Sequence, residues 1–271
     1  MAVRFCVLGS GSKGNAALIA GPHTRLLIDC GFSANAIAAR LEGTGVTWET
    51  LDAVLLTHTH QDHVRATPLR ECLAQNITLF CHETHIRFLE GRRQYRKLCD
   101  AGLVKTFDAG TPFKLPGGAQ ACALPVPHDC ARTFGFSVHL PETEHETKCI
   151  VYVADAGHWT KALSEYAAAA NLLALEFNHD EDLERSSWRP ADLIKRVLGP
   201  NGHLSNRQAA DAVRDVCRHG TPPGTLVLLH LSLECNRPKL AYAAALQALG
   251  ENPNTNVFLT RQDERGSVLD V

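Results

Sequence analysis

The chain has 271 residues, of which 45% are hydrophobic and 21% are charged, and its formal net charge at pH 7 is −2. Hydrophobic residues spread over the whole length exclude a disordered or fibrous chain and indicate a globular protein. The near-neutral charge argues against a protein that coats nucleic acid by bulk electrostatic attraction, so any polyanion must be held locally.

The N-terminal segment and the cysteines both favour a cytoplasmic protein. The apolar run in residues 1–8 ends at Gly9 and is too short for a signal-peptide core or a membrane span. The 10 cysteines include no C-x-x-C pair. Those within apolar runs, Cys6, Cys30, Cys81 and Cys149, are expected to be reduced core residues, because free cysteine packs as a small hydrophobe.

Short apolar runs of strand length, each bounded by turn residues, recur along the chain. They are Arg4–Leu8, Arg25–Cys30, Ala53–Leu56, Thr78–Phe80, Gln120–Leu124, Phe134–His139, Cys149–Val153, Leu172–Glu176, Leu226–Leu229 and Asn256–Thr260. Helical spacing of apolar residues predicts helices over Ala34–Leu41, Pro68–Ala74, Ile86–Ala101, Thr160–Ala170, Arg207–His219 and Pro238–Leu249.

The order of these elements indicates one domain over residues 1–271. The Pro/Gly clusters at 116–118 and 221–224 have the size of turns rather than linkers, and no repeat or low-complexity stretch interrupts the chain. Two packed sheets with helices over their outer faces would accommodate this order.

The densest polar motif follows the predicted strand at 53–56: residues 58–63 read His-Thr-His-Gln-Asp-His. Side chains alternate in an extended segment, so His58 and His60 point to the same side and can hold one metal ion. Asp62 and His63 lie one turn onward and can face a second ion. Imidazole and carboxylate groups are usual ligands of zinc-like metals, whereas the cysteine pairs of structural zinc sites are absent from the sequence. For each histidine taken alone, the alternative is a solvated loop position.

This motif resembles the signature of the metallo-β-lactamase superfamily, and residues 26–31, Leu-Leu-Ile-Asp-Cys-Gly, resemble the strand that precedes it in that family. The resemblance implies an α/β fold, the αββα four-layer sandwich of two mixed sheets flanked by helices. It also implies three further metal ligands, His128, Asp155 and His230, in the motifs at 125–129, 152–157 and 228–232.

The ligands that the resemblance implies form two sets, with Asp155 bridging two metal ions. Two ions about 3.5–4 Å apart can act together on a phosphate ester. We expect zinc or manganese as the cofactor, with iron as a further candidate for such ligands. The full set of implied ligands is His58, His60, Asp62, His63, His128, Asp155 and His230.

Further motifs resemble one branch of the superfamily. Residues 202–206, Gly-His-Leu-Ser-Asn, resemble a motif of tRNase Z and related nucleases in which the histidine, here His203, assists catalysis. Glu176 resembles the carboxylate that orients this histidine, so the resemblance implies catalytic roles for Asp62, His203 and Glu176. The nearest likeness is to the YycJ/WalJ group of single-domain proteins, through residues 8–15, 178–180 and 232–238, although Cys235 and Arg237 depart from the group's pattern.

Members of the YycJ/WalJ group are regarded as 5′ to 3′ DNA exonucleases linked to mismatch repair. The resemblance therefore implies a dinuclear metal-dependent phosphodiesterase whose partner and substrate is DNA. The segment between Asp155 and His203 is too short for the inserted domain of longer relatives, so we expect an open active site. The alternatives are a small-molecule metallo-hydrolase of the same fold, acting on a cyclic phosphodiester, a lactone or a thioester, and a scaffold without enzymatic activity.

Three other segments have two interpretations each. The glycine-rich residues 9–15 form either a tight turn or a loop whose N–H groups contact phosphate. His82 and His85 are expected on a helix surface or at a pocket rim, with no metal. The basic run at 87–97 is either a solvated helix face or a surface that follows a phosphate backbone, through Arg92, Arg93, Arg96 and Lys97.

Overall fold

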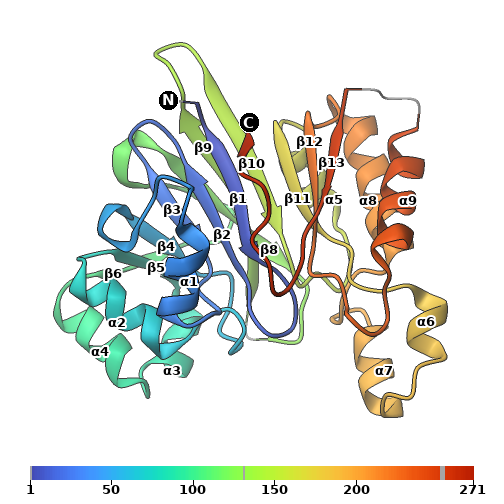
Figure 1. Ribbon diagram of the computed structural model, residues 1–271, viewed down its shortest axis with the longest axis horizontal. Helices are drawn as coiled ribbons and strands as arrows, with labels where there is room; N and C mark the ends of the chain where they lie inside the picture. The colour runs from blue at the N-terminus through green and yellow to red at the C-terminus, as the bar shows by residue number, and fades with distance from the viewer. Residues whose placement is uncertain (1, 131, 251–253) are drawn as a thin grey trace.

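The computed structural model describes residues 2–130, 132–250 and 254–271, and its strands form two seven-stranded sheets that pack face to face (Figure 1). The first sheet has the spatial order β14-β1-β2-β3-β4-β5-β6. Its strands are β1 (Arg4–Gly9), β2 (Ala16–Ala20), β3 (Arg25–Ile28), β4 (Ala53–Leu55), β5 (Thr78–His82), β6 (Val104–Phe107) and β14 (Leu269–Asp270).

The second sheet has the order β13-β12-β11-β10-β9-β8-β7. In this second sheet, pairing is antiparallel from β7 to β10 and parallel from β10 to β13. In the first sheet, pairing is antiparallel from β14 to β3 and parallel from β3 to β6. Both sheets are therefore mixed. The strands are β7 (Pro112–Lys114), β8 (Gln120–Val126), β9 (Thr133–Pro141), β10 (Thr147–Val153), β11 (Leu172–Glu176), β12 (Thr225–Leu229) and β13 (Asn256–Leu259).

The central strands of both sheets are apolar on both faces because both faces are covered. In β1, Phe5 and Val7 point into the core between the sheets, whereas Cys6 and Leu8 point into the core beneath the helices. Such strands appear in the sequence as continuous apolar runs rather than as an alternation of apolar and polar residues.

Helices form the two outer layers (Figure 1). The first sheet is covered by α1 (Ala34–Leu41), α2 (Ala66–Ala74), α3 (Ile86–Leu89) and α4 (Arg93–Asp100). The second sheet is covered by α5 (Lys161–Ala167), α8 (Asn206–His219) and α9 (Pro238–Leu249). Two short helices, α6 (Glu181–Arg185) and α7 (Ala191–Val197), lie below them in Figure 1. The predicted αββα sandwich is thus confirmed.

Some predicted elements were wrong or missing. The single helix expected over residues 86–101 is divided at Glu90–Arg92, where Gly91 is a poor helix former and Arg92 has an extended backbone that begins α4. The strands β2, β6, β7 and β14 and the helices α6 and α7 were not predicted. The cysteines predicted in the core, Cys6, Cys30, Cys81 and Cys149, are buried and free. None of the helices in the described part of the chain combines the length and apolar character needed to cross a membrane.

Candidate metal centre

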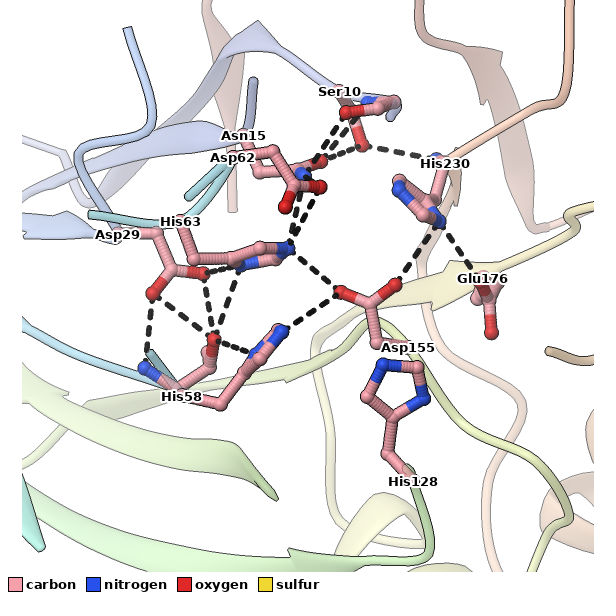
Figure 2. Close-up of polar contacts among 12 residues, drawn as sticks. Ser10, Asn15, Asp29, His58, Asp62, His63, His128, Asp155, Glu176 and His230 are labelled. Atoms are coloured by element: carbon pink, nitrogen blue, oxygen red, sulfur yellow. Dashed lines mark hydrogen bonds and ion pairs between the residues drawn. The ribbon is translucent and has the colours of Figure 1, made fainter. Parts of the chain in front are cut away.

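The predicted ligands lie where strands of the two sheets end. Residues 58–63 follow β4, Asp155 follows β10 and His230 follows β12, which places them at the carboxyl ends of parallel strands, where α/β proteins commonly bind ligands. The backbone φ angles are 53° at Asp155 and 55° at His230. A left-handed backbone costs a residue with a Cβ roughly 1–2 kcal/mol, and such strain concentrates at functional sites. Figure 2 shows His58, His63 and His230 pointing toward Asp155.

The first group contains His58, His60 and His128, whose ligand atoms lie within 4.8 Å of one another. Nδ1 of His128 lies 3.0 Å from the carbonyl oxygen of Gly202, to which it donates. Nδ1 of His58 contacts Oγ1 of Thr57 at 3.0 Å. Because Nδ1 is occupied in both rings, Nε2 is the nitrogen left for a metal ion.

Asp155 lies between this group and the remaining ligands. Its Oδ2 is 2.7 Å from Nε2 of His63 and 4.0 Å from Nε2 of His58, and its Oδ1 is 3.2 Å from Nδ1 of His230. His58, His63 and Asp155 therefore form a second group of potential ligands. The carboxylate has the position expected of a bridge between two ions.

Asp62 is grouped with the other ligand atoms less tightly than the remaining predicted ligands are. Its Oδ2 lies 3.6 Å from Nε2 of His63, and its side chain lines the same cavity as His60 and Asp155. Asp62 falls outside the three tight groups of ligand atoms found in the described residues. The third of those groups joins Asp155 and His230 to Glu176 and His203 instead.

Two buried nitrogens in this centre, Nε2 of His58 and Nε2 of His230, make no hydrogen bond. A buried polar atom without a partner costs about 1–3 kcal/mol, and native proteins leave few of them. Cations bound at the centre would satisfy both nitrogens. The donors are imidazole and carboxylate groups, which suit zinc, manganese or iron, so the described residues fit two divalent ions.

The protonation of His63 supports the same conclusion. Burial lowers the pKa of His63, but the nearby carboxylates of Asp29, Asp155 and Asp62 outweigh burial and raise the pKa well above its usual range. Nδ1 of His63 lies 2.7 Å from Asp29 and Nε2 lies 2.7 Å from Asp155. A neutral ring has only one N–H, so its other nitrogen would turn a lone pair toward a carboxylate, and the two contacts together require an additional positive charge. A proton can supply that charge in the metal-free protein, and a metal ion can supply it in the loaded protein.

The glycine-rich loop at residues 9–15 contacts several of the proposed ligands and holds them in place. The sequence did not indicate this role of the loop. Oγ of Ser10 accepts a hydrogen bond from the backbone N–H of His230 at 2.9 Å. Nδ2 of Asn15 donates to Oδ2 of Asp62 at 3.3 Å and lies 3.0 Å from Nε2 of His63. A Cβ at Gly31 would lie only 1.7 Å from the carbonyl oxygen of Asp62, so only glycine fits there. Ser12 lines the cavity itself.

Glu176 contacts two histidines at once. Its Oε1 lies 2.7 Å from Nδ1 of His203 and 2.9 Å from Nδ1 of His230, while Oε2 accepts from the backbone N–H groups of Ala156 and Leu204. Burial raises the pKa of Glu176, but its charge interaction and hydrogen bond with His203, together with His230, lower the pKa to about 2. The orienting role predicted for Glu176 would act through its contact with His203, and the contact with His230 was not expected.

The cavity above these residues has a volume of about 340 Å³. Helix α7 and the turn before it form one wall, through Arg189, Leu193, Arg196 and Val197. Arg196 is ion-paired with Asp129, the residue after His128. The segment between Asp155 and His203 was expected to be too short to cover the site. It nevertheless forms one wall of the cavity.

His82 and His85 are not exposed, so their predicted position on a helix surface or a pocket rim is wrong. Both are buried, and both rings pack against Phe134. Nε2 of His85 donates to the carbonyl oxygen of Arg132 at 2.8 Å. Burial lowers the pKa of both histidines, to about 4 for His85, so both are neutral residues of the core.

Comparison with known proteins agrees with the fold and the site. The family model of a beta-lactamase superfamily domain matches residues 24–231. The chain belongs to the metallo-β-lactamase superfamily, and it has the hydrolase fold of that family with a His/Asp metal site.

Its full-length relatives include two named exodeoxyribonucleases. Exodeoxyribonuclease YycJ of Bacillus anthracis is 27% identical over 258 residues, covering 93% of this chain and 90% of that protein. Exodeoxyribonuclease WalJ of Streptococcus pneumoniae serotype 2 is 28% identical over 253 residues, covering 92% and 88%. The crystal structure of the metallo-β-lactamase fold protein YhfI from Bacillus subtilis is similar with a TM-score of 0.70 and 20% identity, covering 98% of this chain and 99% of YhfI.

Proposed function

We propose that this protein is a dinuclear metal-dependent phosphodiesterase that degrades DNA as a 5′ to 3′ exonuclease. The observation that carries the proposal is the contact of 2.7 Å between Glu176 and His203 beside the His/Asp centre. Phosphodiester hydrolysis requires a proton for the leaving oxygen, and a histidine held by a carboxylate is a suitable donor. The full-length likeness to two exodeoxyribonucleases supports DNA as the substrate.

The proposed ligands divide around Asp155. The first ion would be held by His58, His60 and His128 and the second by Asp62, His63 and His230, with Asp155 shared between them. When bound, two such ions supply Lewis-acid activation of water and neutralise charge on the phosphate oxygens. The orphaned nitrogens of His58 and His230 support this assignment.

His203 would protonate the leaving oxygen. Its Nδ1–H donates to Glu176, which fixes the tautomer and the ring orientation, so Nε2 is left for the substrate. The His203 side chain lines the cavity and is only 16% exposed, so the substrate can reach the ring while most bulk water is kept from it. Glu176 is therefore a positioning residue in this mechanism, and His203 is the catalytic acid.

One observation favours the alternative, a small-molecule hydrolase. The cavity volume of about 340 Å³ lies in the range of small-molecule sites. A nucleic-acid strand would need surface beyond the cavity, and such surface adjoins it on the side of His60 and His128. There Arg87, Phe88 and Arg92 line a second hollow that both histidines share.

A substrate panel would separate the two functions. We expect metal-loaded protein to hydrolyse bis-p-nitrophenyl phosphate and 5′-phosphorylated DNA but not a lactone or a thioester, and chelation should remove both activities. Turnover of the lactone or thioester without cleavage of DNA would replace the proposal with the small-molecule function. The Asp155→Asn protein serves as the control for contaminating nucleases.

A further inference from the structure

Trp188 lies in the turn between α6 and α7. It is 85% exposed, more than any other large apolar residue in the part of the chain that the structure describes. Leu233, which is 63% exposed, lines the same hollow of about 580 Å³. This hollow adjoins the metal cavity, because Ser232 lines both and Arg189, the neighbour of Trp188, lines the metal cavity. Two exposed apolar side chains beside an active site indicate a binding surface.

The turn that carries Trp188 is anchored. Nη1 of Arg189 lies 3.0 Å from Oε2 of Glu184, a side chain with no exposed surface, and Nε lies 2.9 Å from Oε2 of Glu234. Nη2 of the same guanidinium donates to Oγ of Ser232 at 3.3 Å. The backbone next to Trp188 is thus held to the loop that follows the ligand His230, and the indole is presented to solvent from a fixed position.

The charges around the hollow favour a neutral, flat occupant. Arg237 and Arg261 line it together with Glu234, Asp263 and Glu264, so the cations do not outnumber the carboxylates. Nη1 of Arg237 is already used, since it donates to the carbonyl oxygens of Glu234 and Asn236. A phosphate would gain little in this hollow, whereas a nucleobase would stack on the indole, an interaction that tolerates any base sequence.

We propose that Trp188 and Leu233 form a base-binding subsite for a nucleotide near the scissile phosphate of a single-stranded DNA end. This inference rests on the proposed function, because the phosphate must lie at the His/Asp centre when the base lies on Trp188. A base in a duplex is stacked and paired, so the subsite selects unpaired ends. Trp188 acts in substrate positioning and takes no part in bond cleavage.

The test combines protein variants with DNA that lacks one base. A series of 5′-phosphorylated single strands carries one abasic nucleotide at successive positions, and KM and kcat are measured for wild-type, Trp188→Ala and Trp188→Phe proteins. We expect one abasic position to raise the wild-type KM roughly tenfold, the usual scale of one base–aromatic stack. Trp188→Ala should raise KM by the same factor on intact DNA and lose the response to that position, and Trp188→Phe should retain most of both.

Leu246→Ala is the control, because Leu246 is an exposed apolar residue of α9 that does not line the hollow. It should leave KM unchanged. An abasic response that persists in Trp188→Ala would overturn the subsite. Altered sedimentation of Trp188→Ala but not of Leu246→Ala, with unchanged KM, would overturn the subsite and assign the hollow to contact between copies of this chain. If wild-type protein hydrolyses bis-p-nitrophenyl phosphate but no DNA, the nuclease function itself fails and the subsite fails with it.

Discussion

The carboxylate of Asp29 lies 2.7 Å from Nδ1 of His63, and both side chains are fully buried. Because this contact occupies Nδ1, only Nε2 of His63 can face Asp155 and a metal ion. Asp29 is itself held by Thr57, whose backbone N–H and hydroxyl both donate to it. The orientation of a ligand within residues 58–63 thus depends on a residue at the end of β3.

Replacing Asp29 by Asn should lower the affinity for the metal ion that His63 would hold by roughly 10–100-fold, the usual effect of losing a partner behind a ligating histidine. The amide keeps the volume of the side chain but loses its charge. Competition with a chromophoric chelator measures the affinity. Asp100→Asn, the same change at an exposed position of α4, is the control. Unchanged affinity in a folded Asp29→Asn protein would show that His63 does not need this partner.

Asp155→Asn should abolish turnover and reduce bound metal from about two ions to one or fewer, because the bridging carboxylate serves both ions. Asn is preferred to Ala for this test, since Asn tolerates the left-handed backbone at this position better than Ala does. Metal content is measured by plasma mass spectrometry after gel filtration. Two retained ions together with full activity would remove Asp155 from the centre.

His203→Ala should retain its metal and lose roughly 10²–10⁴-fold in kcat, the usual contribution of a general acid. Metal analysis and kinetics on the same preparation test this outcome. Loss of metal would make His203 a ligand, which its place in the group with Asp155 and His230 allows geometrically.

Glu176→Gln should have a broader effect than His203→Ala, because Oε1 of Glu176 contacts both His203 and His230. We expect lower kcat together with weaker metal binding. Comparison of the two variants at saturating metal separates the effects: excess metal should restore occupancy in Glu176→Gln but not its full turnover. Full recovery of turnover would mean that Glu176 acts only through His230.

Metal binding should release protons. Burial lowers the pKa of His230, but Asp155 and Glu176 outweigh burial and raise the pKa to about 9 in the metal-free protein. Below that pH His230 holds a proton that a metal ion must displace, so apparent metal affinity should rise with pH up to about 9. Calorimetric titration in two buffers of different ionisation enthalpy measures the number released at pH 7.5. A value of zero would contradict the assignment of His230 as a ligand.

The basic residues of α4 should contribute to DNA binding without affecting chemistry. Arg92 is partly engaged, since its Nη1 donates to the carbonyl oxygen of Val64, so the exposed Arg93 and Arg96 are the better pair to neutralise. The double Gln variant should weaken DNA binding and reduce its salt dependence by about one to two units of slope. Hydrolysis of bis-p-nitrophenyl phosphate should be unchanged. Equal loss of both activities would indicate a damaged fold, and unchanged DNA binding would leave α4 as a solvated face.

The sequence predicted two packed sheets with outer helices, and its family likeness implied the four-layer sandwich and the metal ligands. Arg189 and Arg196, which line the cavity, were not predicted. Strands buried on both faces appear as apolar runs, and the motif at 58–63 places four polar side chains together by local chain geometry alone. Asp155 and His230 were found only through family likeness, because neither has a distinctive local pattern. The unpredicted strand β2, Ala-Ala-Leu-Ile-Ala, contains three residues of low strand propensity.

The residues that orient the ligands could not be found from the sequence. Asp29 and His63 are 34 positions apart, and Ser10 and His230 are 220 positions apart. No periodicity encodes such contacts, because the first forms only when β3 pairs with β4 and the second only when the two sheets pack. Helix α6 was missed for another reason: it has five residues, four of them charged, so tertiary contacts such as the Glu184–Arg189 pair hold it rather than an apolar stripe.

The most direct measurement of the central claim is the release of nucleotides from 5′-phosphorylated single-stranded DNA labelled at one end, by protein of known metal content. We expect successive release from the 5′ end at a rate proportional to the fraction of protein that carries two ions, and no release by Asp155→Asn protein. DNA that stays intact with doubly loaded wild-type protein, or equal release by metal-free protein, would contradict a metal-dependent phosphodiesterase.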